Sequence, residues 1–185
     1  MWEDYAALAV SFVAVGLVVA SYFFKEKRLY LCFQALGIFG VAVSYLFTKE
    51  FFAMIGTGIS CARTVTYFCY EQKDKKAPLW VTFLFLALAL ASYFIVNFAI
   101  LQTAKPYDLI CLTSLTLYGF IFRVRNMKFV RFSMLLPLAL SVLYNCIASS
   151  TIFVILSYAF EFCASVVAIF KYHILPKRST TNEAN

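Results

Sequence analysis

Two charged residues lie within long apolar stretches of this sequence, Arg63 and Glu161. A lone charge at the centre of a bilayer costs about 2.5 to 3.5 kcal/mol on insertion scales, so each side chain should face the protein interior. Smaller polar residues accompany both charges at helical spacing. They form two polar stripes, Gly56, Ser60, Arg63, Thr64 and Tyr67 on one side, and Ser157, Tyr158, Glu161, Ser165 and Tyr172 on the other.

These stripes predict a polar site near the middle of a membrane, with Arg63 and Glu161 at its centre. The side chains expected to line it with them are Ser60, Tyr67, Ser157, Tyr158 and Asn145. Pro137 interrupts an apolar stretch and removes a backbone hydrogen bond, so we expect it to act as a hinge. Such a site could bind a polar solute or move a proton. The rival interpretation is a structural clasp in which the two charges only fix helix packing.

Catalytic and cofactor chemistry leave no signature in the sequence. It holds no Ser/His/Asp set, no metal-spaced His or Cys cluster and no Gly-rich phosphate loop. The six cysteines lie in or at the ends of apolar stretches without a CxxC pair, as packing residues do. We therefore expect a protein that is not an enzyme and that has no catalytic residue, cofactor or metal.

The composition indicates a protein of the bilayer. Hydrophobic residues make up 63% of the 185 residues and charged residues 14%, with a mean hydropathy of +0.84. A spanning helix needs about 20 largely apolar residues. Seven stretches meet this need, at 5–24, 29–47, 51–70, 79–101, 107–122, 129–146 and 150–172. The expected fold is all-α, a polytopic membrane protein with seven transmembrane helices, and its expected partner is the lipid bilayer.

The basic residues predict the orientation of these helices. Thirteen Lys and Arg residues fall on one side of the predicted topology, whereas the other side has only Lys49 and Lys105. The positive-inside rule then places the N-terminus outside and the C-terminus in the cytoplasm. Topology explains the net charge of +7, so we expect no nucleic-acid partner. Tyrosines at the ends of the stretches, among them Tyr22, fit an interfacial belt.

The chain also matches itself at an offset of 98 or 99 residues. Phe24-Lys25-x-Lys27 aligns with Phe122-Arg123-x-Arg125, and Tyr45 aligns with Tyr144. Three helices per copy would invert the second copy, so a linker helix must restore its direction. We expect parallel three-helix repeats at 1–76 and 106–178, a linker helix at 77–105 and a disordered tail at 179–185.

Short motifs across nearly the whole chain resemble the YgjV-like bacterial inner-membrane proteins. They are the basic hairpin near Lys25, the Ser60-Cys61-Ala62-Arg63 turn, the loop from Arg123 to Lys128 and the Tyr144-Asn145 helix end. This resemblance implies a location in the bacterial inner membrane and carries no established activity. The 3+1+3 layout is more distantly similar to SWEET, or PQ-loop, sugar facilitators and to PnuC vitamin transporters, which implies facilitated diffusion of a small polar solute.

Two departures separate the chain from those transporters. SWEET proteins have a proline in the first two helices of each repeat, whereas this chain has only Pro137 in such a position, and the tryptophan motif of PnuC is absent. The leading hypothesis is a transporter or facilitator for a small polar solute, in which two three-helix bundles rock about a midplane site. The alternative is a non-transporting membrane scaffold or receptor subunit. The oligomeric state stays open.

Overall fold

A computed structural model describes residues 2–48, 51–95, 107–147 and 152–174 of the chain. Within these ranges the chain forms seven α-helices and a final π-helical segment, η2, and no strand, so the expected all-α fold is confirmed for this part. The helices are α1 (Trp2–Ser21), α2 (Lys27–Thr48), α3 (Phe51–Gln72), α4 (Leu79–Phe94), α5 (Asp108–Arg123), α6 (Met127–Ile147) and α7 (Ile152–Ile169), and η2 spans Phe170–Ile174.

Local signals at three helix boundaries explain where these helices start and stop. After α3, Asp74 adopts a positive φ of 52°, and the N–H of Lys75 donates to the Tyr70 carbonyl at 3.0 Å, which is a Schellman ending. Pro78 holds an extended conformation directly before α4. The Asn126 side-chain oxygen accepts the backbone N–H of Lys128 at 2.9 Å and so caps the start of α6.

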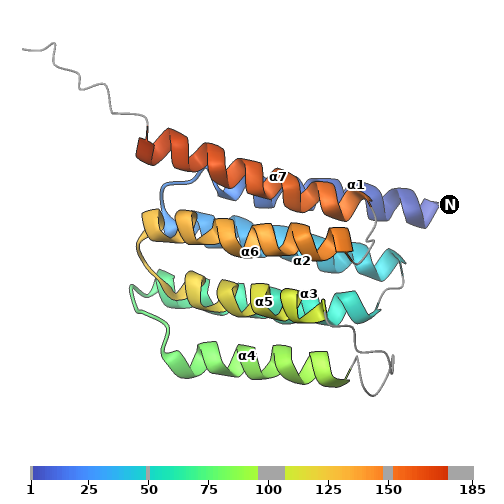
Figure 1. Cartoon of the computed structure of the whole chain (residues 1–185), viewed down its shortest axis with the longest axis horizontal. Coiled ribbons are helices and arrows are strands. Elements are labelled where there is room, and N and C mark those ends of the chain that lie inside the picture. The colour runs from blue at the N-terminus through green and yellow to red at the C-terminus, as the bar shows by residue number, and fades with distance from the viewer. Residues whose placement is uncertain (1, 49–50, 96–106, 148–151, 175–185) are drawn as a thin grey trace, which may run out of the picture.

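The seven helices lie side by side and alternate in direction (Figure 1). The N-terminus and the end of α7 therefore lie at opposite ends of the bundle. The connections α1–α2, α3–α4 and α5–α6 share the end at which α7 finishes. They carry most of the basic residues on the densely charged side of the predicted topology, and we call this end of the bundle the charged end.

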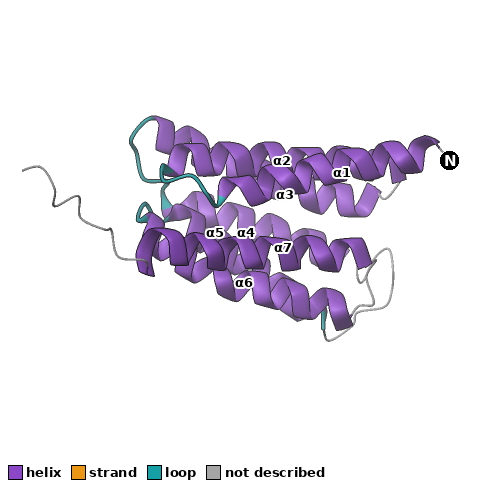
Figure 2. Ribbon diagram, turned by 90° about the horizontal axis from the view of Figure 1, so that it is seen from above, coloured by secondary structure: helices purple, strands orange, loops and turns teal. Residues whose placement is uncertain are grey.

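Helix contacts divide the bundle into two groups. Helix α2 packs against both α1 and α3, α6 packs against both α5 and α7, and α4 lies against α3 and α5. Helix α1 also contacts α7, which joins the two groups. Figure 2 shows α1–α3 on one side and the other helices opposite. The internal repeat and the linker role of α4 stay predictions, and the tail at 179–185 lies outside the described residues.

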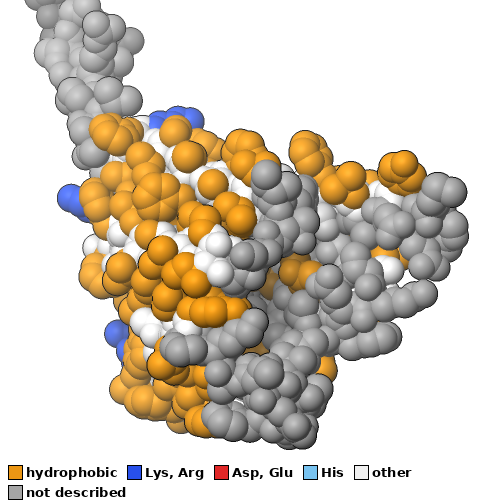
Figure 3. Space-filling view, turned by 45° about the vertical axis from the view of Figure 1, so that its right-hand side comes forward, with side chains coloured by type: hydrophobic (Ala, Val, Ile, Leu, Met, Phe, Trp, Pro, Cys, Tyr) orange, Lys and Arg blue, Asp and Glu red, His pale blue; other side chains and the backbone are white. Residues whose placement is uncertain are grey.

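The outer surface is apolar, as contact with lipid requires. Large side chains such as Phe12, Trp80 and Phe160 are more than half exposed. Apolar side chains cover the described part of the face in Figure 3, with a few Lys and Arg side chains at its margin. By length and composition, three of the described helical segments could cross a membrane, Lys27–Phe47, Met127–Ile147 and Ile155–Tyr172. Shorter apolar helices run over Leu8–Ser21, Leu79–Phe94 and Leu109–Arg123.

Small residues let α1 and α2 approach each other closely. A Cβ atom on Gly37 would lie 2.8 Å from the Ala14 backbone oxygen and would also meet the Val18 side chain, and one on Gly40 would lie 2.8 Å from the Ala14 Cβ. A backbone atom cannot move aside as a flexible side chain can. The separation of α1 and α2 therefore depends on the absence of a side chain at Gly37.

We predict that Gly37→Ala destabilises the protein by about 1–3 kcal/mol, because the added methyl group forces α1 away from α2. The expected result is a lower Tm in a thermal-shift measurement of the purified protein in detergent. Gly16→Ala is the matched control, since nothing lies within 4 Å of a Cβ there and alanine favours a helix. Equal Tm values for the two variants would contradict the close approach of α1 and α2.

Candidate functional site

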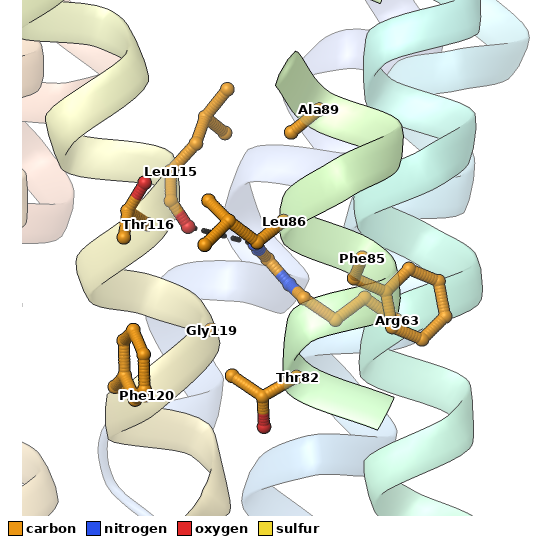
Figure 4. A pocket seen from close by; sticks show the side chains of 9 residues that line it. All are labelled: Arg63, Thr82, Phe85, Leu86, Ala89, Leu115, Thr116, Gly119 and Phe120. Atoms are coloured by element: carbon orange, nitrogen blue, oxygen red, sulfur yellow. Dashed lines mark hydrogen bonds between the residues drawn. The ribbon is translucent and has the colours of Figure 1, made fainter. Parts of the chain in front are cut away.

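Arg63 projects from α3 into the space between α4 and α5. Its side chain is buried, and its Nη1 atom donates a hydrogen bond to the backbone oxygen of Leu115 on α5 at 3.0 Å (Figure 4). The surrounding cavity is lined by Arg63, Thr82, Phe85, Leu86, Ala89, Leu115, Thr116, Gly119 and Phe120. The volume of this cavity that a water molecule can occupy is only about 10 Å³. This cavity has room for roughly one water molecule and none for a larger solute.

Tyr67 lies one turn beyond Arg63 and ties the same three helices together. Its hydroxyl lies 2.9 Å from the Thr82 hydroxyl on α4 and donates to the Gly119 backbone oxygen on α5 at 3.0 Å. The Arg63 guanidinium also lies 5.8 Å from the centre of the Phe122 ring, at cation–π distance. Arg63 and Tyr67 therefore join α3 to α4 and α5, and neither lines a solute-sized space.

Glu161 on α7 is in a different situation. Its side chain is largely buried, and no hydrogen bond or ion pair reaches its carboxylate in the described part of the chain. It lies within electrostatic reach of four tyrosine hydroxyls, which we call the tyrosine cluster: Tyr22, Tyr30, Tyr118 and Tyr158. A carboxyl group with no partner in an apolar bundle is costly, which sets Glu161 apart from Arg63.

Ring contacts, in part through Phe122, connect three members of the tyrosine cluster, Tyr22, Tyr30 and Tyr118. The ring centres of Tyr22 and Tyr30 lie 5.7 Å apart, edge to face, and those of Tyr30 and Tyr118 lie 6.1 Å and 5.9 Å from that of Phe122. Tyr22 and Tyr30 are fully buried and their hydroxyls lie near each other, but within the described ranges neither hydroxyl makes a hydrogen bond of good geometry. The cluster therefore presents unpaired polar atoms to an unpaired carboxyl group.

The structure does not join Arg63 to Glu161. No ion pair links these two described residues, although each lies within electrostatic reach of the Tyr118 hydroxyl. The Phe122 ring contacts the Arg63 guanidinium, and it also contacts Tyr30 and Tyr118. The Phe122 ring thus contacts both the Arg63 guanidinium and two members of the tyrosine cluster, and no direct bond joins the two predicted centres of the site.

The other predicted site residues lie apart from this cluster, except Tyr158. Asn145 is buried on α6 and donates to the Ser141 backbone oxygen at 2.7 Å. Ser60 is half-buried on α3, next to the Arg63 region, and Ser157 is half-buried on α7 beside Tyr158. Tyr158 and Ser157 thus lie on the same helix as Glu161, Ser60 lies on the same helix as Arg63, and Asn145 lies on a third helix.

Pro137 lies inside α6 and is buried. Its carbonyl oxygen accepts hydrogen bonds from Ser114 on α5 at 2.8 Å and from Ser141 at 2.9 Å. Ser114 thereby ties α5 to α6 beside the proline. The hinge function of Pro137 stays a prediction.

Three members of the tyrosine cluster are absent from the predicted site. We expected Tyr22 at a membrane interface, but it is fully buried among protein side chains. Tyr30 and Tyr118 do not stand out within apolar stretches, because a phenol ring counts as hydrophobic in such patterns. One signal was present: Tyr118 and Phe122 are four residues apart and share one face of α5.

The charged end holds a network of ion pairs between the two helix groups. The Glu71 carboxylate at the end of α3 forms ion pairs with Lys27 at 3.0 Å and with Arg125 at 3.5 Å. The Asp74 carboxylate forms ion pairs with Arg28 at 2.6 Å and with Arg125 at 3.2 Å. Lys27 and Arg28 belong to α2, whereas Arg125 lies between α5 and α6, so Arg125 links the second group to the first.

Two hydrogen bonds from the second helix group also join it to the first group at the charged end. Arg131 on α6 donates to the Phe24 backbone oxygen at 2.6 Å, and the Tyr172 hydroxyl donates to the Phe23 backbone oxygen at 2.6 Å. The Arg131 guanidinium also lies 4.5 Å from the centre of the Tyr172 ring. The connection between α1 and α2 is therefore held by side chains from α6 and from η2.

The sequence was compared with known families, curated proteins and solved structures. The model of the Imp-YgjV family, described as a bacterial inner membrane protein, matches residues 5–174. No curated protein and no solved structure matches the chain.

We predict that Tyr67→Phe destabilises the protein by about 1–3 kcal/mol, because the Thr82 hydroxyl and the Gly119 carbonyl lose a buried partner. A thermal-shift measurement should show a lower Tm. Tyr5→Phe serves as the control, since the Tyr5 side chain is 71% exposed. If both variants melt at the temperature of the parent protein, Tyr67 does not tie the three helices.

A second prediction concerns Asp74. The hydrogen bond from Arg28 holds the pKa of the Asp74 carboxyl below its usual value. A pKa lowered in the folded state means that this pairing stabilises the protein above the usual aspartate pKa of about 3.9, and that the stabilisation fades as the pH falls through the lower folded value.

Asp74→Asn keeps a residue that tolerates a positive φ and removes the charge. We expect a small decrease in Tm at pH 7, and the difference from the parent protein should begin to shrink below about pH 4 and vanish once the pH is below the lowered pKa of folded Asp74. Melting curves across this pH range check the prediction. A difference that stays constant with pH would show that the charge of Asp74 does not contribute.

Proposed function

This chain belongs to the Imp-YgjV family of bacterial inner membrane proteins, and we propose that it moves a small polar solute across that membrane. One observation carries the proposal: the Glu161 carboxyl group lacks a partner in the described part of the chain, as do the nearby hydroxyls of Tyr22 and Tyr30. Buried polar groups are nearly always paired, and ionisable groups inside membranes are usually functional. A bound solute would supply the missing partner.

The elements that carry these residues support a site between two moving halves. Tyr22 directly follows α1 and Tyr30 lies on α2, whereas Tyr118 lies on α5 and Glu161 on α7. Rocking of α1–α3 against α5–α7 would pull the two sets of residues apart. In transporters built from repeats, such motion exposes a central site first to one side and then to the other.

We further propose that the charged end faces the cytoplasm and is the closed end in this conformation. The basic residues gathered there follow the positive-inside rule. The ion pairs of Arg125 with Glu71 and Asp74 hold the two groups together at this end, while the ribbons of the two groups spread apart toward the opposite end in Figure 2. Opening to the cytoplasm would require Arg125 to release both carboxylates.

A non-transporting scaffold or receptor subunit is the second candidate. Arg63 favours it, because its hydrogen bond to Leu115 and its water-sized cavity amount to a structural tie. Glu161 does not fit this role, since its carboxylate bonds no neighbouring helix among the described residues. A scaffold function accounts for Arg63, and solute movement accounts for Glu161.

Water access from both sides of the membrane distinguishes the two candidates. We predict that Glu161→Cys, in a variant whose six native cysteines are replaced by alanine, reacts with a charged, membrane-impermeant thiol reagent. Reaction should occur in intact spheroplasts and also in inside-out vesicles, because the site opens alternately. Labelling is measured as the loss of a second, fluorescent thiol label.

Ser165→Cys is the matched control, because Ser165 lies one turn further along α7 and is fully buried. It should react from neither side. Arg125→Ala should speed the labelling of Glu161→Cys from the cytoplasmic face several-fold, since it removes the ion pairs that close that end. Labelling of Glu161→Cys from neither face, or from one face alone, would contradict the transport proposal.

A further inference from the structure

The sign of the charge at the tyrosine cluster indicates what kind of solute it would bind. Glu161 supplies a negative charge when it is ionised, and the Arg63 guanidinium is bonded to the Leu115 backbone oxygen. A second cation, Arg131, lies within electrostatic reach of Tyr30, but its guanidinium is bonded to the Phe24 backbone oxygen and stacked on Tyr172. Both arginines are thus engaged elsewhere, and the charge of Glu161 is left without a counter-charge.

The walls of the cluster suit a cation. Tyr22, Tyr30 and Tyr118 supply three aromatic rings that pack against one another or against Phe122, and Tyr158 completes the set of hydroxyls within electrostatic reach of Glu161. Aromatic faces attract a cation through their quadrupole, and the attraction grows where water is excluded. The unpaired hydroxyl oxygens of Tyr22 and Tyr30 can also accept hydrogen bonds from an ammonium group.

Other classes of solute fit this chemistry less well. A hard metal cation needs six or more oxygen ligands, and the described residues hold no group of three or more His, Cys, Asp or Glu side chains that could bind a metal. An anion would be repelled by an ionised Glu161. A neutral sugar offers no counter-charge to an ionised Glu161, whereas a cation does.

We propose that the solute is an organic monocation of the ammonium type, which Glu161 neutralises and the tyrosine cluster surrounds. This inference rests on the proposed function and gives it a substrate class. Glu161 provides the counter-charge, the tyrosine rings provide cation–π contact, and the hydroxyls of Tyr22 and Tyr30 accept hydrogen bonds where the ammonium carries protons.

A thermal-shift titration of the purified full chain tests the inference with a matched pair of probes. Choline is the cationic probe, and 3,3-dimethylbutan-1-ol is its neutral isostere, so they differ in charge and hardly in shape. Tetramethylammonium is a third probe, and sodium chloride controls for ionic strength. At ten times its Kd, a bound cation should raise the Tm by about 3–5 °C.

The variants assign the effect to this site. Glu161→Gln should lose the stabilisation by choline, because it keeps the volume of the side chain and removes the charge. Tyr30→Phe should weaken stabilisation by ethanolamine, whose ammonium donates hydrogen bonds, more than stabilisation by tetramethylammonium, which cannot donate one. Glu161→Asp keeps the charge and should retain part of the choline effect, which keeps the test decisive if Glu161→Gln does not fold.

Two results would overturn the inference. One is an equal shift by choline and by its neutral isostere. The other is that no cation shifts the Tm while Glu161→Cys is still labelled from both faces. That result would reject a cationic solute and leave the proposed movement of a solute intact. Loss of both the shift and the two-sided labelling would remove the proposed function as well.

Discussion

Every charge placed inside the apolar bundle must find a partner, and this constraint organises the protein. Arg63 meets it with the Leu115 backbone oxygen and the Phe122 ring, so one charge ties α3 to α5. Glu161 does not meet it within the described residues. The two charges look equivalent in the sequence, yet one is satisfied by the fold and the other is left for something outside it.

The distribution of bonds between the two helix groups follows a similar logic. At the charged end, Arg125 bridges Glu71 and Asp74, and Arg131 and Tyr172 bind the connection between α1 and α2. The ion pair of Arg125 with Asp74 is exposed to solvent, so it can break and re-form at little cost. One turn further into the bundle, the groups also meet through the ring contact between Tyr30 and Phe122. Reversible polar bonds at this end, with ring contacts just inside it, suit two halves that separate and close.

The sequence predicted the helices and the burial of the two charges, because long apolar stretches and the cost of a charge in lipid are local properties. It did not predict their partners. The backbone oxygen of Leu115 accepts the hydrogen bond from Arg63, and no pattern of side chains in the sequence can reveal such a partner. Tyr22 lies at a helix end, where a tyrosine usually faces the interface, yet the packing of α1 on α2 turns it inward. Which groups meet was decided by tertiary packing.

The central claim is that Arg63 and Glu161 do not act as each other's partner. The most direct test is a double-mutant cycle with Arg63→Met and Glu161→Gln, in which the free energy of unfolding is measured in mixed micelles. Independent residues give additive effects, so the account predicts a coupling energy below about 0.5 kcal/mol. A larger coupling, with the double variant more stable than the sum of the single effects predicts, would show that the two charges form a clasp and would contradict the account.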